Sequence, residues 1–172
     1  PNSLGPGELL VRHGTKEQQG KFLPRLADGT LIPCFGLTGV HSGSDATSLI
    51  GSYGTVERDA SGELGVRATF DKRYITLAPV AGIVGIGFDL KDPDGLLDGA
   101  TGAGEGFTVA LLERDHPGLR MGPRHMPLAA AFMNGTVQGE DVWIPMDAIL
   151  GGEAKCGQGW HMFVEALAEG RG

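Results

Sequence analysis

The sequence is poor in features that stabilise secreted proteins or anchor chains in membranes. It has two cysteines in 172 residues, Cys34 and Cys156, and their separation matches no metal-ligand or redox motif. We therefore expect free thiols in a reducing compartment. No apolar run approaches the roughly 20 residues that span a bilayer, and the first residues lack the basic start and apolar core of a signal peptide. One ordinary soluble domain with its own core is expected.

Basic residues are also scarce. Fourteen Lys and Arg against 21 Asp and Glu give a formal net charge of −7 and a pI near 5.1. This balance argues against a nucleic-acid surface, which needs clustered cations, so local donors must meet any phosphate-bearing ligand. Arg120, Arg124 and His125 form one small basic group, which fits a ligand phosphate, a solvated edge or a subunit contact. No phosphate-binding loop of the P-loop or Rossmann type occurs.

Hydrolytic and metal-dependent chemistry lack their usual motifs. His41, Ser42, Ser44 and Asp45 crowd one turn, where they cannot take nucleophile, base and orienting positions around one centre, and no GxSxG elbow occurs. The histidines are scattered, without an HExxH pair. We predict no metal site and no catalytic residue within this chain.

Glycine, by contrast, is abundant. Thirty glycines and only 6 % aromatic residues favour a turn-rich β domain over a helical bundle, because glycine is costly inside helices. Apolar patterning and turn residues predict strands or extended pieces at 33–38, 52–58, 63–71, 80–90, 107–113, 119–121 and 133–144. Short strands with glycine turns indicate a β-sandwich or β-barrel.

Two of these strand predictions are specific. A turn at 59–62 should join its neighbouring strands in a hairpin. The run 80–90 is apolar without polar alternation, so it should be buried on both faces. Its glycines are expected where another backbone or a ligand comes close.

Helices are expected near both ends of the chain. Thr15 and Gln18 form a capping box, so a helix should start directly after Thr15. Pro24 predicts a break into two pieces, 16–23 and 24–28, with the next glycine as the stop. A second helix is predicted at 160–169, with an apolar side made by Phe163, Ala166 and Leu167.

Two polar stretches are candidates for a binding site. Residues 35–45 run from an apolar strand into a glycine- and hydroxyl-rich turn, whose backbone N–H groups are open to a flat, polar or anionic ligand. In the stretch 72–76, alternation should put Tyr74 and Thr76 on one face, where a ring and a hydroxyl would meet a planar ligand. Each stretch also has a structural explanation: a tight loop for the first, a half-buried strand face for the second.

These stretches resemble the middle domain of the acyl-CoA dehydrogenases, above all the large bacterial form used in fatty-acid β-oxidation. The motifs that carry the likeness are Leu37-Thr38, Gly43-Ser44-Asp45 and Lys72-Arg73-Tyr74-Ile75-Thr76. It extends along nearly the whole chain, through Gly14-Thr15-Lys16-Glu17-Gln18, residues 22–27, Glu165-Ala166-Leu167 and Gly170-Arg171-Gly172. Two departures bear on the turn geometry and on ring stacking. Many members have Glu-Pro-Gly in place of Gly39-Val40-His41, and tryptophan in place of Tyr74.

The resemblance implies a mainly β fold, an acyl-CoA dehydrogenase middle-domain-like β-barrel or sandwich with short helical segments at both ends. It divides the chain into the end of an N-terminal helical domain (1–31), a β middle domain (32–150) and the start of a C-terminal helical domain (151–172). The chain would thus be a fragment of a larger protein. FAD is the implied cofactor, acyl-CoA the substrate, electron-transfer flavoprotein the acceptor, and a homo-oligomer the full-length assembly. The implied location is the cytoplasm or, for the full-length protein, a membrane surface.

The resemblance also implies which residues bind the flavin. They are Phe35, Leu37, Thr38, Gly43, Ser44, Tyr74, Ile75 and Thr76, with Ser44 also contacting substrate. Backbone groups near Leu37 and Thr38 would meet the polar edge of the isoalloxazine ring, and the Thr76 hydroxyl would approach N5, the atom that accepts hydride. The catalytic base of the family is a glutamate of the C-terminal helical domain, beyond Gly172. We therefore expect this chain alone to be inactive.

Two other interpretations stay open. Acyl-CoA oxidases and flavin monooxygenases share the architecture, and oxygen reactivity depends on solvent access around the ring, which the sequence does not report. A non-catalytic β module that binds partner proteins is the second. Flavin binding by the chain would separate that module from the flavoproteins.

Overall fold

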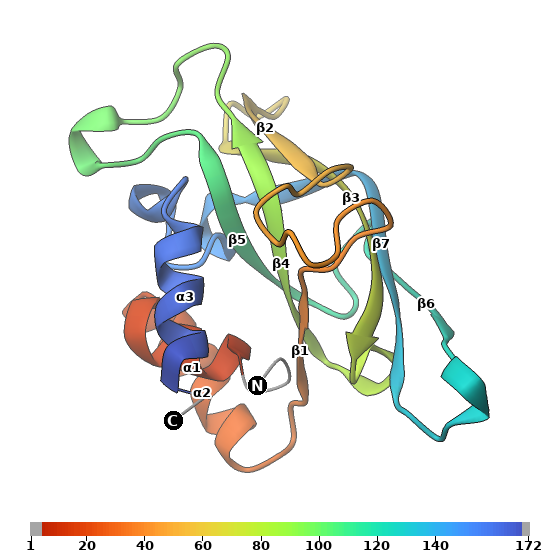
Figure 1. The fold of residues 1–172 in the computed structure, drawn as a ribbon. Coiled ribbons are helices and arrows are strands. Elements are labelled where there is room, and N and C mark those ends of the chain that lie inside the picture. The colour runs from red at the N-terminus through yellow and green to blue at the C-terminus, as the bar shows by residue number, and fades with distance from the viewer. Residues whose placement is uncertain (1–4, 170–172) are drawn as a thin grey trace.

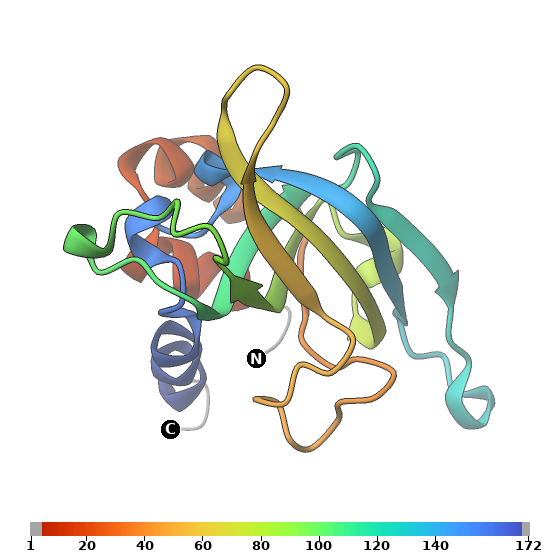
Figure 2. The same cartoon turned by 90° about the horizontal axis from the view of Figure 1, so that it is seen from above.

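A single curled sheet of seven strands runs through the molecule, with three helices gathered on one side of it (Figures 1 and 2). The computed structural model describes residues 5–169, without the side chains of 167–169. The strands are β1 (Pro33–Gly36), β2 (Tyr53–Arg58), β3 (Leu64–Thr76), β4 (Ile83–Lys91), β5 (Gly106–Glu113), β6 (Arg120–Arg124) and β7 (Asn134–Pro145). The helices are α1 (Gly5–His13), α2 (Lys16–Ala27) and α3 (Gly159–Glu169). The predicted mainly β fold with helical ends is confirmed, and the sheet curls into a half-barrel.

β1 and β2 occupy successive halves of one strand position. Both run parallel to β4, β1 beside its first half and β2 beside its end. β3 flanks the same position on its other side, antiparallel to β2, and touches the continuation of β1 through a bridge between Gly39 and Lys72. Residues 37–52 therefore leave the sheet where β1 ends and rejoin it where β2 begins. We call this segment the excursion loop.

The hairpin predicted around the 59–62 turn is confirmed, with Arg58 opposite Leu64. The predicted strand 63–71 is too short, since β3 continues to Thr76. The reason is β7, which pairs with β3 along almost its entire length and supplies backbone partners beyond the hairpin. β6 is likewise longer than the predicted piece because it pairs with β7.

β4 confirms the prediction of a strand buried on both faces. It lies between β5 on one side and β1 and β2 on the other, and it contributes side chains to both apolar clusters of the molecule. The expectation about its glycines is wrong. A Cβ at Gly85 would lie 2.6 Å from the ring of Phe35, and one at Gly87 would lie 2.9 Å from the ring of Phe107. Aromatic side chains, not a backbone or a ligand, fill the space that these glycines leave.

The capping box at the start of α2 is confirmed. The Thr15 hydroxyl accepts from the Gln18 N–H at 3.2 Å, and the Gln18 side chain accepts from the Thr15 N–H at 3.1 Å. The predicted break at Pro24 is wrong, because α2 is one helix. Proline removes its own donor, but its carbonyl still accepts from Asp28 N–H at 3.0 Å, so the last turn closes. Gly29 follows with φ of 78°, as expected for the stop.

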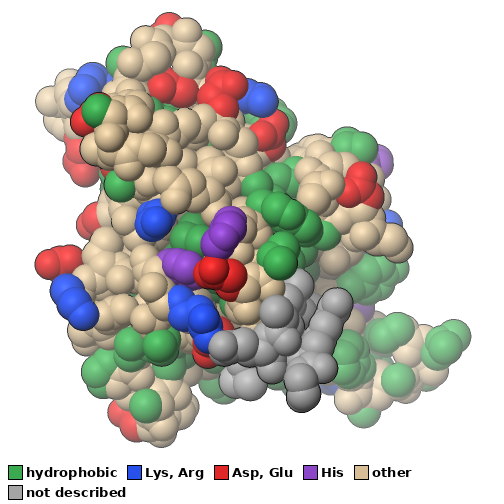
Figure 3. All heavy atoms as spheres, turned by 60° about the vertical axis from the view of Figure 1, so that its left-hand side comes forward, with side chains coloured by type: hydrophobic (Ala, Val, Ile, Leu, Met, Phe, Trp, Pro, Cys, Tyr) green, Lys and Arg blue, Asp and Glu red, His purple; other side chains and the backbone are tan. Residues whose placement is uncertain are grey.

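The three helices share one apolar cluster with the sheet, on the side seen in Figure 3. Phe163 of α3 is buried in it and Ala166 packs against it, as predicted. The Leu167 side chain and Gly170-Arg171-Gly172 lie outside the described residues. Within the described part, no helix has both the length and the apolarity to cross a bilayer. The division into domains at 31/32 and 150/151 stays a prediction.

Candidate functional site

The two stretches singled out in the sequence lie side by side. The Lys72 ammonium donates to the Leu37 carbonyl at 3.1 Å, and the Arg73 N–H donates to the Thr38 carbonyl at 3.0 Å. Both donors come from consecutive residues of β3. They hold the first residues of the excursion loop against the sheet.

The excursion loop is braced by its own polar groups. Gly39 N–H donates to the Ser42 carbonyl at 2.9 Å, which closes a tight turn. The Asp45 carboxylate accepts from the Thr47 hydroxyl at 2.6 Å, and this bond lowers the pKa of Asp45 below its ordinary value. Asp45 therefore shapes the loop. Gly43 and Ser44, between these two braces, are exposed.

Several donors at this edge of the sheet have no partner. Within residues 5–169, no hydrogen bond occupies the N–H groups of Leu37 and Thr38. The same holds, over the described chain, for the hydroxyls of Thr38, Ser44 and Thr76. A ligand with acceptor atoms along one edge would find these donors free.

Phe35 and Ile75 behave differently from the other predicted residues. Phe35 is 3 % exposed and its ring stacks on Phe163, with 5.1 Å between ring centroids. Ile75 is also 3 % exposed and belongs to the main core cluster. Both side chains pack inside the protein, so these two positions could offer a ligand only their backbone.

Tyr74 stands at a bulge in β3. The register with β7 shifts between Lys72 and Ile75, and Tyr74 adopts φ of 57°. Its side chain is 53 % exposed, whereas Ile75 is buried and Thr76 is half-buried, as predicted for alternation across these three positions. Before the bulge the alternation has the opposite phase, since Phe70 and Lys72 are buried and Asp71 between them is exposed.

Three buried polar atoms near Tyr74 lack a partner among the described residues: Arg73 Nε, His125 Nε2 and Asn134 Oδ1. Asn134 lies opposite Thr76 in the β3–β7 ladder, and its carbonyl accepts from His125 N–H at 2.9 Å. An unpaired buried polar group costs about 1–3 kcal/mol, so a bound group that pairs with these atoms would be favourable. No sequence pattern selects Asn134. His125 had appeared only within a small basic group.

Lys72 is a second residue that sequence patterns missed. Its side chain is 0 % exposed, and desolvation lowers the pKa of the amine to about 7. A lysine in an alternating strand is usually taken for a solvated residue. Lys72 follows Ala68 and Phe70 on the buried side of β3, and the bulge that comes after it changes the phase so that Tyr74 is exposed.

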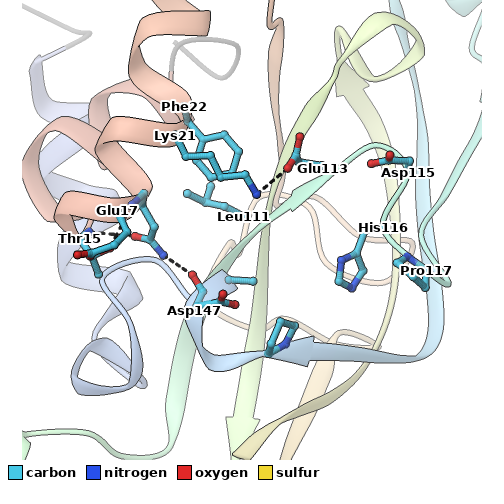
Figure 4. Close-up of a pocket in the computed structure, with 13 residues that line it drawn as sticks. Thr15, Glu17, Lys21, Phe22, Leu111, Glu113, Asp115, His116, Pro117 and Asp147 are labelled. Carbon is cyan, nitrogen blue, oxygen red and sulfur yellow. Dashed lines mark hydrogen bonds and ion pairs between the residues drawn. The ribbon is translucent and has the colours of Figure 1, made fainter. Parts of the chain in front are cut away.

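The structure also has a cleft of about 670 Å³ between α2 and the sheet (Figure 4). It contains none of the predicted site residues. Lys21 bridges to Glu113 across it at 2.7 Å, and this contact lowers the pKa of the Glu113 carboxyl. Gln18, which also lines it, uses both ends of its amide within the protein. Lys21, Glu113 and Gln18 of this cleft thus already have protein partners.

The described residues contain neither a reactive thiol nor a cluster of metal-binding side chains. Cys34 and Cys156 are free and buried, and burial raises the pKa of each thiol to about 12. Such thiols are unreactive at neutral pH. Within residues 5–169, no group of three His, Cys, Asp or Glu side chains is placed to hold a metal ion.

No family model matches the sequence. The chain is 48 % identical over 83 residues to the protein HemX of Proteus mirabilis, a match that covers 48 % of each chain. It is 31 % identical over 170 residues to an acyl-CoA dehydrogenase of Bacillus subtilis, covering 98 % of this chain and 40 % of that protein. The chain thus spans less than half the length of the curated relatives it matches.

Solved structures agree on the fold. A putative acyl-CoA dehydrogenase of Mycobacterium abscessus superposes with a TM-score of 0.75 at 25 % identity, over 97 % of this chain and 39 % of that one. An acyl-CoA dehydrogenase of Bacillus anthracis, solved in complex with FAD, gives a TM-score of 0.73 at 24 % identity over 95 % of this chain and 25 % of that one.

Proposed function

The chain belongs to the acyl-CoA dehydrogenase family, and we propose that in the complete protein it forms one wall of a site for FAD and an acyl-CoA thioester. The observation that carries this proposal is the edge where the excursion loop meets β3. Leu37 and Thr38, whose N–H groups are free, are hydrogen-bonded through their carbonyls to Lys72 and Arg73, and the exposed ring of Tyr74 and the free hydroxyl of Thr76 follow directly in the same strand. A flat ring with acceptor atoms along one edge matches this set of groups.

Each of these residues has a role in the proposal. Leu37 and Thr38 donate to the polar edge of the isoalloxazine, where donors stabilise negative charge in the reduced ring. Tyr74 contacts the ring, and the Thr76 hydroxyl lies towards its N5 side. Ser44, exposed at the loop tip, contacts substrate or a cofactor phosphate, with Gly43 leaving its backbone accessible.

The reaction proposed for the complete protein is α,β-dehydrogenation of an acyl-CoA to trans-2-enoyl-CoA in fatty-acid β-oxidation. FAD held by the residues named above would supply the hydride-accepting chemistry, and the α-proton would go to a carboxylate outside this chain. Electron-transfer flavoprotein is the proposed acceptor, and a homo-oligomer the proposed assembly. This chain would exclude water from one side of the ring and orient it.

Flavin binding provides the test. Addition of the complete apoprotein to free FAD should quench the flavin fluorescence, and an acyl-CoA should then bleach the bound flavin. A Thr38→Ala change removes the hydroxyl and should weaken FAD binding. A complete protein that leaves FAD fluorescence unchanged would overturn the proposal and favour a non-catalytic module.

A further inference from the structure

Lys72 is the one lysine or arginine in the described part of the chain that is fully buried. Its Nζ makes a hydrogen bond to the Leu37 carbonyl at 3.1 Å, and no carboxylate within residues 5–169 forms an ion pair with it. Burying an amine without a counter-ion is costly. A position that keeps such a group despite its cost is a candidate for a functional role.

The side chain reaches this carbonyl by crossing Gly36. A Cβ at Gly36 would lie 3.2 Å from Lys72 Cγ and 3.3 Å from Ile86 Cδ1. The missing side chain on β1 therefore leaves the space through which the lysine stem passes. Sequence and packing together direct the amine to one particular peptide group.

That peptide group joins Leu37 to Thr38. In a trans peptide the C=O and N–H point in opposite directions, so a donor on the Leu37 carbonyl directs the Thr38 N–H away from Lys72. No described residue accepts from this N–H. A hydrogen bond at the carbonyl also polarises the amide and strengthens its N–H as a donor. The Arg73 N–H fixes the following carbonyl, that of Thr38, at 3.0 Å.

We propose that Lys72 is a positioning residue for the flavin: it orients and polarises the Leu37–Thr38 peptide so that the Thr38 N–H donates to the negative edge of the isoalloxazine ring. The inference rests on the proposed function, because it takes the flavin to lie along the excursion loop. It adds a residue that touches neither flavin nor substrate and acts through a backbone amide.

The test uses the complete protein with Lys72→Met, which keeps the length of the stem but removes the donor. FAD affinity of the apoprotein should fall about tenfold, because the Thr38 N–H loses its fixed direction and its polarisation. The reduction potential of the bound flavin should become more negative, because the reduced ring loses stabilisation. Ile86→Val is the matched control: it packs on the same Gly36 without touching the peptide, so it should lower thermal stability and leave both flavin measurements unchanged.

The outcomes separate the two proposals. If the wild-type apoprotein does not bind FAD, the proposed function fails. If it binds FAD and Lys72→Met keeps wild-type affinity and potential, only the role of Lys72 is overturned. Should Lys72→Met not fold, Gly36→Ala replaces it, since it keeps the amine but crowds its stem. Weaker FAD binding in Gly36→Ala would support the inference, and unchanged binding would overturn it.

Discussion

The phenol ring of Tyr74 lies against the imidazole of His125, with 4.8 Å between ring centroids and 42° between ring planes. The Arg73 guanidinium lies 5.3 Å from the centroid of the same phenol ring. These contacts join the β3 bulge to the chain that follows β6. The ring proposed to contact a flavin is therefore exposed but already oriented by the protein.

Removing this ring should weaken flavin binding. Tyr74→Ala in the complete protein is expected to lower FAD affinity about three- to tenfold, since an aromatic contact contributes roughly 0.5–1.5 kcal/mol. Tyr74→Trp, which enlarges the ring, should restore or strengthen binding. Fluorescence titration of the apoprotein measures both, and wild-type affinity in Tyr74→Ala would show that the ring does not contact the flavin.

Thr76 is expected to matter through its hydroxyl. Thr76→Ala should weaken flavin retention or slow flavin reduction by acyl-CoA in the complete enzyme, because a donor near N5 is lost. Thr76→Ser is the matched control, as it keeps the hydroxyl, and it should stay close to wild type. Stopped-flow absorbance of the flavin gives the rate. Equal flavin content and equal reduction rates in all three proteins would remove Thr76 from the site.

The 172-residue chain on its own should show no dehydrogenase turnover with any acyl-CoA, and it should hold FAD weakly or not at all. In the proposal it forms only one wall of the site, and the catalytic base belongs to another part of the complete protein. An assay with an artificial electron acceptor tests this. Measurable turnover would mean that the assignment of the base to another part of the protein is wrong.

Gln18 should be critical for stability because it clamps α2 to the turn before α3. Its side-chain N–H groups donate to the carbonyls of Asp147 at 2.8 Å and Ile149 at 2.7 Å, and its oxygen accepts from Gly151 N–H at 3.0 Å. Gln18→Ala should lower the free energy of unfolding by about 2–3 kcal/mol, since several buried groups lose partners. The exposed neighbour substitution Lys16→Ala should change it by less than about 0.5 kcal/mol. Urea unfolding of both variants tests the clamp, which would be refuted by equal effects.

Gln18 also shows how far sequence reasoning reached. The capping box depends on two residues three positions apart, so local rules were enough to predict it. The bonds to the carbonyls of Asp147 and Ile149 join segments about 130 positions apart, and no local pattern encodes them. Pro24 illustrates the reverse case, where a local rule predicted a break that capping and packing of α2 override.

The candidate site divides in the same way. The motifs at 37–45 and 72–76 were selected from the sequence, and the structure brings them together through the Lys72 and Arg73 hydrogen bonds. The buried side chain of Phe35 was not foreseen, because a motif position does not state which way a side chain faces. Lys72 was missed because alternation counted back from Tyr74 places it on the exposed side, whereas the bulge after Lys72 changes the phase and leaves Lys72 on the buried side with Phe70.

The free energy of unfolding should depend on pH through the ionisation of Lys72. The pKa of Lys72 is lowered to about 7 by burial, whereas an unfolded lysine titrates near about 10.4. Between these values the unfolded chain binds one more proton than the folded chain, so the free energy of unfolding should rise with pH from about 7 to about 10.

Other groups, including the buried thiols of Cys34 and Cys156, titrate in the same range. The measurement is therefore the difference in unfolding free energy between wild type and Lys72→Met, from urea denaturation at a series of pH values. This difference should shift in favour of wild type as the pH rises through the window, and it should be flat below it. A difference that is constant across the range would mean that Lys72 titrates like a solvated lysine, and that its amine is not held in the dry position beside the Leu37 carbonyl.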